Sequence, residues 1–396
     1  MVSMVTFPAR FVGFYSGNSY AERTDRAITE TIFAIETHWS VLIVVSAPST
    51  EKAALSSPIP DVELRMACVN GIRMRYADTG GRGPLVLFTH GWPESWYSWR
   101  HQLVALSRAG YRCVAPDMRG YGATDAPDSA DQFTLFHLVG DLLGLIHSLG
   151  EEHAVIIGHD WGAAVAWHAA LFRPDVFVAV SGMSVPYTPP TEKNTLTRLQ
   201  ELGVSNFYLQ YFQTPGVAET ELERDTRISL RRLYLSTGGE HAKEVFSYLK
   251  DGTLLGNTVD APDLPSWLTR EDLDYYAREF TRTGFRGGLN WYRNIGRNWE
   301  LSGPWRDKPI TQPSLFLAGG NDGVLNFPWA KSQIAAFPKT LPNLRDNHLI
   351  DGAGHWIQQE RPDETNRILL EFLGNLDLRR DVRPIPAGCP NPHRLV

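Results

Sequence analysis

The sequence predicts an α/β fold in which a mostly parallel sheet is covered by helices on both faces. Short apolar strands alternate with helical segments between residues 62 and 183, a long polar and aromatic stretch then breaks this rhythm, and the rhythm resumes near Pro313. Strands separated by crossover helices pair in parallel and bury both faces of the sheet. We therefore expect the 396 residues to form one large domain that carries an insertion and terminal extensions.

The first 61 residues are expected to be an extension and linker outside the main fold. The apolar run at residues 40–46 is too short to span a membrane, and it lies too far from Met1 to be a signal peptide. A surface helix or a peripheral membrane anchor is the alternative for this run. Residues 48–60 are rich in Ser, Ala and Pro, which is typical of a linker.

The first core segment spans residues 62–185 and opens with a hairpin. Asn70-Gly71 separates two strand-like runs, and this dipeptide is a strong signal for a tight hairpin turn. Apolar residues recur with a 3.6-residue period between residues 133 and 149, which predicts an amphipathic helix. Strands are predicted at 62–69, 72–77, 85–88, 111–115, 154–157 and 176–183, and helices at 97–109, 133–149 and 163–171.

Residues 186–305 are expected to form an inserted helical unit, because this stretch is polar and aromatic and has no comparable buried strands. The core resumes over residues 306–378. Its strands are predicted at 314–318 and 348–350, and its last helix is predicted from Pro362, a favourable first-turn residue, to about Leu376. The Pro-rich residues 379–396 are expected to form a flexible tail.

Composition excludes several classes of function. The hydrophobic fraction of 43% and the charged fraction of 21% are ordinary for a globular protein, and the net charge of −6 gives no basic surplus for nucleic acid. The three cysteines, Cys68, Cys113 and Cys389, are widely spaced, so neither a disulfide framework nor a thiolate metal site is expected. This usage favours a cytoplasmic location, and no transmembrane segment is predicted.

The stretch Gly158-His-Asp160-Trp-Gly162 follows a buried strand and precedes a helix. Small residues on both sides of a central residue are typical of a nucleophile elbow, where a tight turn leaves no room for neighbouring side chains. The alternative is an aspartate that simply caps the helix. An aspartate is ionised at neutral pH, so it can attack a saturated carbon and form an alkyl ester without help from a base. Attack on an acyl carbon would give an anhydride, which disfavours ester and amide substrates.

An alkyl ester must next be cleaved by water, and this step requires a base. His355 lies in a glycine-rich loop after the last predicted strand and is the best candidate. Asp322, just after the preceding strand, could orient the imidazole, although Asp-Gly is also a common turn sequence. Asp351 is the fallback. The order of nucleophile, acid and histidine is that of α/β-hydrolases.

Several longer motifs make the chain resemble the epoxide hydrolase family of the α/β-hydrolase fold. The resemblance covers residues 62–378, about four-fifths of the chain. Its core motifs are also shared with haloalkane dehalogenases, whereas the two motifs in the helical unit are more specific. The motifs are His90-Gly-Trp-Pro93, Asp117-Met-Arg-Gly-Tyr-Gly122, Gly158-His-Asp-Trp-Gly162, Gly354-His355-Trp356, Tyr211-Phe-Gln-Thr-Pro-Gly-Val-Ala-Glu219 and Gly284-Phe-Arg-Gly-Gly-Leu-Asn-Trp-Tyr292-Arg-Asn294.

This resemblance implies roles for residues around Asp160. The helical unit would be a cap, and the backbone N–H groups of Trp92 and Trp161 would form an oxyanion hole. His90, Gly91 and a cis bond at Pro93 would shape the turn that carries Trp92. Two cap tyrosines would protonate the opening epoxide: Tyr292, and Tyr208 with Tyr211 in reserve. The side chains of Trp92, Trp161 and Trp291 are expected to line the pocket.

The expected function is epoxide hydrolysis to a vicinal diol, with a small hydrophobic epoxide and water as substrates and with no metal or organic cofactor. The same Asp-His-Asp set could instead serve a haloalkane dehalogenase, in which Trp or Asn N–H groups assist the departing halide. A binding protein without catalysis on the same scaffold is a third possibility, disfavoured because the full residue set is present. Oligomeric state is left open, with a homodimer as one option.

Overall fold

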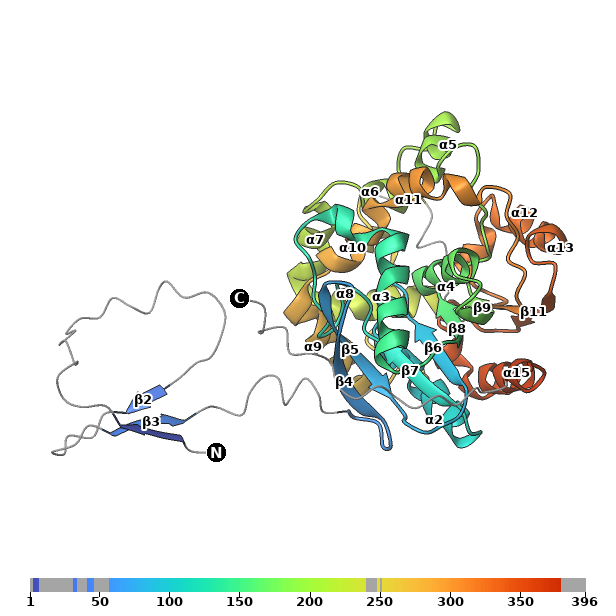
Figure 1. Ribbon diagram of the computed structural model, residues 1–396. Coiled ribbons are helices and arrows are strands. Elements are labelled where there is room, and N and C mark those ends of the chain that lie inside the picture. Colours follow the sequence, from blue (N-terminus) through green and yellow to red (C-terminus); the bar gives the residue numbers. More distant parts are fainter. Residues whose placement is uncertain are drawn as a thin grey trace. The chain divides into compact units, whose positions relative to one another are not determined.

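The computed structural model describes residues 57–239, 248–249 and 251–378, together with three short strands closer to the N-terminus (Figure 1). The chain divides into two compact units, residues 1–58 and residues 59–396. Most of the predicted linker, and the predicted tail at 379–396, lie outside the described residues.

The first unit contains a small antiparallel sheet. Its strands are β1 (Ser3–Thr6), β2 (Thr31–Phe33) and β3 (Val41–Val45), in the order β1-β3-β2. Residues 41–45 of the predicted apolar run therefore form a central strand, and the alternative of a surface helix at this position is wrong.

The second unit is built on an eight-stranded sheet of order β11-β10-β9-β8-β6-β7-β5-β4. The pairs β4–β5 and β5–β7 are antiparallel, and all other neighbours are parallel. The strands are β4 (Glu63–Val69), β5 (Ile72–Asp78), β6 (Leu85–Thr89), β7 (Arg112–Pro116), β8 (Ala154–His159), β9 (Phe177–Met183), β10 (Ser314–Gly319) and β11 (Leu344–Ile350). The mostly parallel sheet predicted from the alternation of strands and helices is confirmed.

Helices cover both faces of this sheet. On one face α3 packs against α4, and on the other α2 packs against α15. Their bounds are α2 (Arg100–Arg108), α3 (Leu135–Ser148), α4 (Trp161–Phe172) and α15 (Pro362–Gly374). The central strands β6, β8 and β10 are buried along their whole length because helices lie on both sides.

Two elements differ from the sequence expectation in extent. The helix expected at 97–109 begins as a 3-10 turn, Trp96–Trp99, before α2. The strand expected at 348–350 begins earlier, at Leu344, as β11. This strand lies at the sheet edge and exposes several polar side chains, so the apolar pattern that marks a buried strand is missing from its first half.

We refer to residues 186–305 as the helical insertion. Its described residues form helices but no strand, apart from an isolated bridge between Phe207 and Tyr248. Figure 1 shows α5, α6, α7, α10 and α11 grouped over one end of the sheet. The α-helices are α5 (Thr195–Glu201), α6 (Tyr208–Tyr211), α7 (Val217–Leu222), α8 (Thr226–Thr237), α9 (Arg270–Thr283), α10 (Arg286–Arg293) and α11 (Ile295–Leu301).

Buried polar contacts attach the helical insertion to the sheet. Arg75 of β5 pairs with Asp117 (Nε to Oδ2, 2.6 Å) and with Glu279 of α9 (Nη2 to Oε2, 2.8 Å). The phenol of Tyr187 donates to the carbonyl of Lys308 at 3.3 Å. The chain therefore leaves and re-enters the core at neighbouring points.

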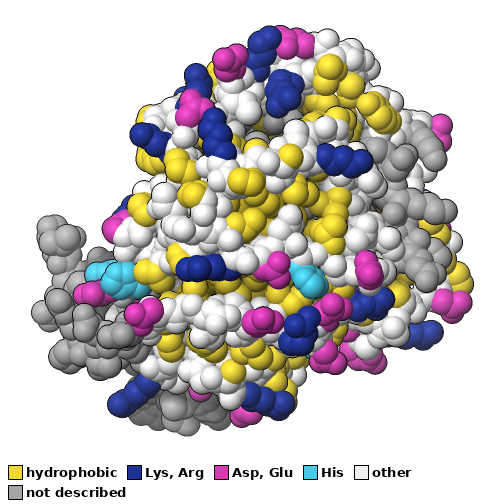
Figure 2. All heavy atoms as spheres, turned by 90° about the vertical axis from the view of Figure 1, so that its right-hand side faces the viewer, with side chains coloured by type: hydrophobic (Ala, Val, Ile, Leu, Met, Phe, Trp, Pro, Cys, Tyr) yellow, Lys and Arg dark blue, Asp and Glu magenta, His cyan; other side chains and the backbone are white. Residues whose placement is uncertain are grey.

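The surface in Figure 2 mixes charges of both signs and gathers hydrophobic side chains across its middle, with no block of one charge on this face. No helix among the described residues combines the length and apolarity needed to cross a membrane. The same part of the chain holds no group of three or more His, Cys, Asp or Glu arranged to bind a metal ion.

Candidate active site

Asp160 occupies a strained turn between β8 and α4. Its backbone angles are φ 53° and ψ −122°, a region that a residue with a side chain rarely adopts. The side chain does not make the hydrogen bond of an N-cap to α4, so a simple helix cap does not account for this conformation. Strain of this kind is typical of functional positions.

The flanking glycines explain why the turn can be this tight. A Cβ atom on Gly158 would lie 2.1 Å from the carbonyl oxygen of Gly162, and one on Gly162 would lie 2.0 Å from that of Thr89. A Cβ atom on Gly91 would meet the Asp160 side chain at 2.4 Å. Glycine at these positions lets the β6 and β8 turns approach each other closely.

Two backbone N–H groups face the Asp160 carboxylate. The amide of Trp92 donates to Oδ1 at 2.8 Å, and the amide of Trp161 also hydrogen-bonds this carboxylate. The Trp92–Pro93 peptide is cis, as the resemblance implied. Burial raises the pKa of Asp160 above its ordinary value, while His355, His159 and these two amides favour the charged form. The Trp92 amide in particular is placed to stabilise negative charge on Oδ1.

His355 lies between Asp160 and Asp322. Its Nδ1 is 3.1 and 3.2 Å from the two Asp322 oxygens, and its Nε2 is 3.7 Å from Oδ2 of Asp160. Since a carboxylate only accepts, Nδ1 carries the proton toward Asp322 and Nε2 is directed at Asp160. Burial alone would lower the pKa of His355, but the charges of Asp322 and Asp160 raise it to about 9.

Asp322 is fully buried, and burial alone would raise its pKa. The charge of His355 and hydrogen bonds from His355, Ser184 and the Val324 amide instead lower this pKa below its ordinary value. Ser184 Oγ also lies 3.0 Å from His355 Nδ1. Asp351, the fallback acid, is exposed, whereas Asp322 has the direct contact with the imidazole.

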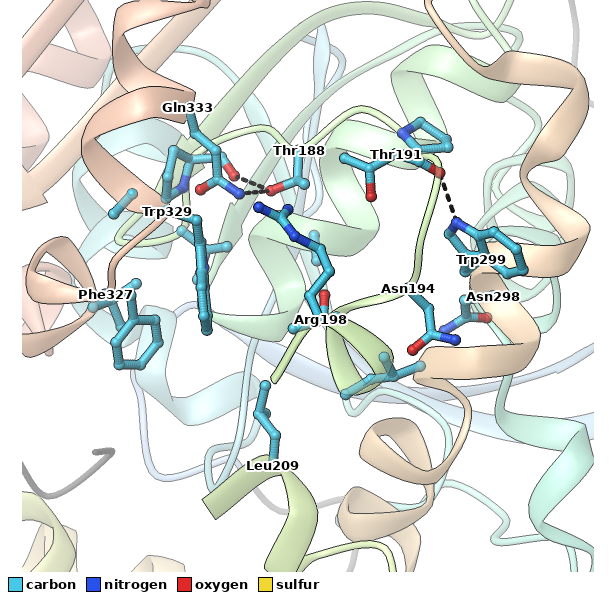
Figure 3. Close-up of a pocket in the computed structure, with 18 of the residues that line it drawn as sticks. Thr188, Thr191, Asn194, Arg198, Leu209, Asn298, Trp299, Phe327, Trp329 and Gln333 are labelled. Atoms are coloured by element: carbon cyan, nitrogen blue, oxygen red, sulfur yellow. Dashed lines mark hydrogen bonds between the residues drawn. The ribbon is translucent and has the colours of Figure 1, made fainter. Parts of the chain in front are cut away.

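Asp160 opens into a cavity of about 350 Å³ beneath the helical insertion. Tyr208 of α6 and Tyr292 of α10 line this cavity together with Trp161, and the two tyrosine rings lie 6.0 Å apart. Burial, and next the charge of Asp160, raise the pKa of both phenols well above the ordinary value, so both hydroxyls stay protonated. Figure 3 shows the outer part of the same cavity, with Phe327, Trp329 and Leu209 on its walls.

Comparison with known proteins places this arrangement in a family. Residues 84–362 match the model of the alpha/beta hydrolase fold. The chain is 44% identical to epoxide hydrolase A of Mycobacterium tuberculosis, over 80% of this chain and 98% of that protein. Epoxide hydrolase 1 of Siraitia grosvenorii is 42% identical over 79% of this chain and 98% of its own length. The chain belongs to the epoxide hydrolase family.

Solved structures agree with this assignment. The crystal structure of epoxide hydrolase A from Mycobacterium thermoresistibile superimposes with a TM-score of 0.76 at 44% identity, covering 80% of this chain and all of that one (100%). Potato epoxide hydrolase I gives a TM-score of 0.74 at 38% identity, over 80% of this chain and 100% of its own. The chain is thus a hydrolase of the epoxide hydrolase family with an α/β-hydrolase fold.

Other residues named from the epoxide hydrolase motifs lie in different places. Trp291 is fully buried, donates its indole N–H to the Arg119 carbonyl at 3.1 Å, and is not among the cavity-lining residues. Trp92 is likewise absent from the lining and packs edge-on against the Tyr292 ring. The side chains of Trp92 and Trp291 therefore lie behind the residues that line the cavity. Tyr211 points away from the cavity and donates to Glu221 at 2.6 Å.

His90 holds the turn that carries Trp92 and does not reach the cavity. It is fully buried, with Nδ1 2.9 Å from the Gly91 carbonyl and with Nε2 accepting from the Met118 amide at 3.0 Å. Both ring nitrogens are thereby occupied by the backbone, which is an architectural role.

Sequence reasoning missed a buried pair, Glu94 and His159. Glu94 Oε2 accepts from the Gly91 amide at 2.7 Å and lies 3.0 Å from His159 Nδ1, while His159 Nε2 is 2.7 Å from the His355 carbonyl. This pair connects the turn before Trp92 to the loop of His355. A usable signal was present, because Glu94 follows the His-Gly-Trp-Pro motif inside an aromatic run where a charge has no solvent to face.

Glu360 is a second missed residue. Its carboxylate accepts from the amides of Gly354 and Trp356, on both sides of His355, and from Gly239 beyond the end of α8, each at 2.8 Å. The His355 amide in turn donates to the Thr237 carbonyl at 2.8 Å. The loop of His355 is therefore held from both the core and the helical insertion.

Proposed function

We propose that this protein hydrolyses an epoxide to a vicinal diol through an alkyl ester on Asp160, with the helical insertion acting as a cap. The observation that carries the proposal is the placement of a strained carboxylate, an Asp-paired histidine and two protonated phenols around one cavity. Epoxides are the substrates named for its relatives.

In the first step Oδ2 of Asp160 attacks one oxirane carbon. Oδ2 is the oxygen proposed for attack because Oδ1 is held by the Trp92 amide. The carbon–oxygen bond of the ring breaks, and its electron pair stays on the oxygen. Tyr208 or Tyr292 donates a proton to this oxygen, which leaves a β-hydroxyalkyl ester and a tyrosinate.

In the second step water attacks the ester carbonyl carbon. His355 accepts a proton from this water through Nε2, and Asp322 stabilises the resulting imidazolium. Negative charge develops on Oδ1, which accepts from the Trp92 amide, and the Trp161 amide next to it is proposed as the second donor. Collapse releases the diol and the Asp160 carboxylate, and the proton left over restores the tyrosine.

Two contacts favour this chemistry over dehalogenation. A departing halide needs free N–H donors in the pocket, but the indole N–H of Trp291 is bonded to the Arg119 carbonyl. The Trp161 ring lies edge-on against the Tyr292 ring, with centroids 5.1 Å apart, so its side chain also faces a phenol. An alkoxide instead needs a proton, and the two phenols supply it.

Trapping the ester tests the proposal. His355→Gln and wild-type enzyme are mixed with an aryl epoxide, and the Asp160 peptide is analysed by mass spectrometry. The variant is expected to accumulate an adduct of the epoxide's mass on this peptide, whereas Asp160→Asn, the matched control, accumulates none. Absence of the adduct from His355→Gln would refute the covalent route. Parallel assays for diol and halide distinguish epoxide hydrolysis from dehalogenation.

A further inference from the structure

Arg198 places a positive charge in the wall of the cavity that contains Asp160. The residue lies on α5 and lines this cavity with Thr188, Asn194 and Gln333. Figure 3 shows its side chain extending across the outer part of the cavity, between Trp329 and Asn194. Among the lining residues only Asp160, Arg198 and His168 can carry charge near neutral pH, and burial lowers the pKa of His168 below its ordinary value. Arg198 is therefore the cation of the cavity.

The Arg198 guanidinium has no partner within the described part of the chain. No ion pair or side-chain hydrogen bond joins it to another described residue, although its backbone amide donates to Asn194. The nearest acid along α5, Glu201, is already paired with Lys193 at 2.7 Å. Most of the neighbouring arginines of the helical insertion, such as Arg227, Arg231 and Arg293, do have carboxylate partners.

The polar groups around Arg198 add to the same chemistry. Gln333 donates to Thr188 Oγ1 at 2.6 Å, and the Thr188 hydroxyl in turn donates to the Pro186 carbonyl at 3.4 Å, so polar side chains are held in place beside Arg198. Away from this region the wall is aromatic and aliphatic, with Leu209, Phe327 and Trp329. One cavity thus combines a reactive end at Asp160, an apolar stretch and a cationic, hydrogen-bonding end.

We infer that the preferred substrate is an epoxide that carries an anionic group, such as a carboxylate, at the end remote from the oxirane, and that Arg198 binds this group. The inference rests on the proposed epoxide hydrolysis and adds the substrate class. A guanidinium presents a planar set of N–H donors that matches two carboxylate oxygens. The negative charge of Asp160 would repel the same group, so the anion is directed to the Arg198 end and the oxirane to the nucleophile.

This contact is made equally in the bound substrate and in the transition state. It should therefore lower KM for the anionic substrate and leave kcat unchanged. A charge-assisted hydrogen bond of ordinary strength predicts about a tenfold preference in kcat/KM over a neutral analogue. Since Arg198 is exposed to solvent, added salt should reduce the preference.

The test uses full-length enzyme and three series of terminal epoxides of matched chain length. The series end in a carboxylate, its methyl ester and a trimethylammonium group, each at several chain lengths. Wild type should prefer the carboxylate at one chain length. Arg198→Ala should raise KM for that acid about tenfold and leave the ester unchanged, Arg198→Lys should keep part of the preference, and Arg198→Glu should shift it to the ammonium compound.

Arg227→Ala is the matched control, because Arg227 is an exposed cation of the helical insertion that pairs with Asp274 and does not line the cavity. It should leave all three series unchanged. If Arg198→Ala raises KM for the acid and the ester equally, or for neither, the guanidinium does not bind the carboxylate and the inference is wrong. If none of the epoxides yields a diol in wild type, the proposed function itself fails. Turnover of the ester shows that each variant is folded.

Discussion

At the scale of single residues, the surroundings of the site lower the pKa of one side chain and raise the pKa values of three others. Asp322 is held ionised, His355 is raised to about 9, and the phenols of Tyr208 and Tyr292 are raised well above their ordinary range. In the proposed mechanism, ionised Asp322 orients the base, His355 holds a proton between the two steps, and the phenols of Tyr208 and Tyr292 donate a proton to the alkoxide. These shifts lead to specific expectations for variants and for pH.

Replacing the cavity tyrosines should impair ring opening and spare ester hydrolysis. Tyr208→Phe and Tyr292→Phe each remove one proton donor and are expected to lower kcat/KM roughly tenfold, and the double variant roughly 10²–10⁴-fold. Rapid-quench kinetics would show slower formation of the Asp160 ester with its decay unchanged. Tyr211→Phe is the control, because this phenol bonds Glu221 outside the cavity. Equal loss in all three single variants would contradict the assignment.

Forming the ester should change the pKa of His355. In the free enzyme the charges of Asp322 and Asp160 raise this pKa to about 9, but esterification removes the charge of Asp160. The pKa of His355 should then fall, so that neutral imidazole becomes available when water must be activated. Single-turnover ester hydrolysis should rise with pH and level off, with an apparent pKa below that of His355 titrated by NMR in free enzyme. Equal values would contradict this coupling.

The raised pKa also predicts how stability depends on pH. Because the folded pKa of about 9 exceeds the ordinary 6.5, protonated His355 stabilises the fold fully below about pH 6.5, and this contribution is lost as the pH rises through about 9. The difference in unfolding temperature between wild type and His355→Gln should therefore be larger at pH 6 than at pH 10. If the difference in unfolding temperature is the same at both pH values, histidine and glutamine at position 355 differ only in how they pack, and the predicted charge effect is absent.

At the scale of elements, α10 sits where it does because Gly287 touches the core. A Cβ atom on Gly287 would lie 2.2 Å from the carbonyl oxygen of Gly120 and 2.7 Å from its Cα. Tyr292 lies on the same helix. The close contact between two glycines thus helps to set the distance between Asp160 and Tyr292, one of the two proposed proton donors.

Gly287→Ala should displace α10 and reduce turnover. Overpacking of this kind costs typically 1–3 kcal/mol, and misplacing Tyr292 should lower kcat by at least tenfold, since small shifts of reacting groups cost up to about 10²-fold. Gly296→Ala on α11 is the control, because nothing lies within 4 Å of the point where its Cβ atom would stand, and this change should be neutral or slightly stabilising. The unfolding midpoints and kcat of both variants are measured. Equal values for the two variants would contradict the role given to the contact between Gly287 and Gly120.

Elements and motifs differ in how far the sequence could predict them. The elbow around Asp160 and the hairpin at Asn70-Gly71 are local, because each depends on glycines next to it in the chain, and both were predicted. The contacts of Glu94 with His159 and of Glu360 with Gly239 join residues 65 and 121 positions apart. No local pattern encodes such pairings. The indole of Trp291 was misplaced for the same reason, since its partner Arg119 is 172 positions away.

At the scale of the whole molecule, the residues proposed for catalysis all lie in the second unit. The sheet, the helical insertion and the cavity belong to residues 59–396. About 80% of the chain covers 98% of the Mycobacterium tuberculosis relative, so roughly a fifth of the chain has no counterpart there. The unit formed by residues 1–58 is therefore expected to be dispensable for turnover.

Removing residues 1–58 should leave kcat/KM and the unfolding temperature of the remaining chain within experimental error of the full-length values. Both quantities are measured on the two proteins side by side, with solubility recorded as well. A large loss of turnover in a truncated protein that still unfolds cooperatively would show that the first unit contributes to the site.

The hydrogen bond between Tyr187 and Lys308 has a consequence for how such enzymes could diversify. The helical insertion leaves the core after β9 and returns before β10 at neighbouring points. It can therefore be replaced as one segment without altering the strands that precede Asp160, Asp322 and His355. Swapping residues 186–305 for the equivalent segment of a relative should then transfer substrate preference, provided that the new segment supplies counterparts of Tyr208 and Tyr292 and of the Thr237 contact with the His355 loop. The helical insertion can therefore vary in sequence between relatives as long as these few contacts with the core are kept.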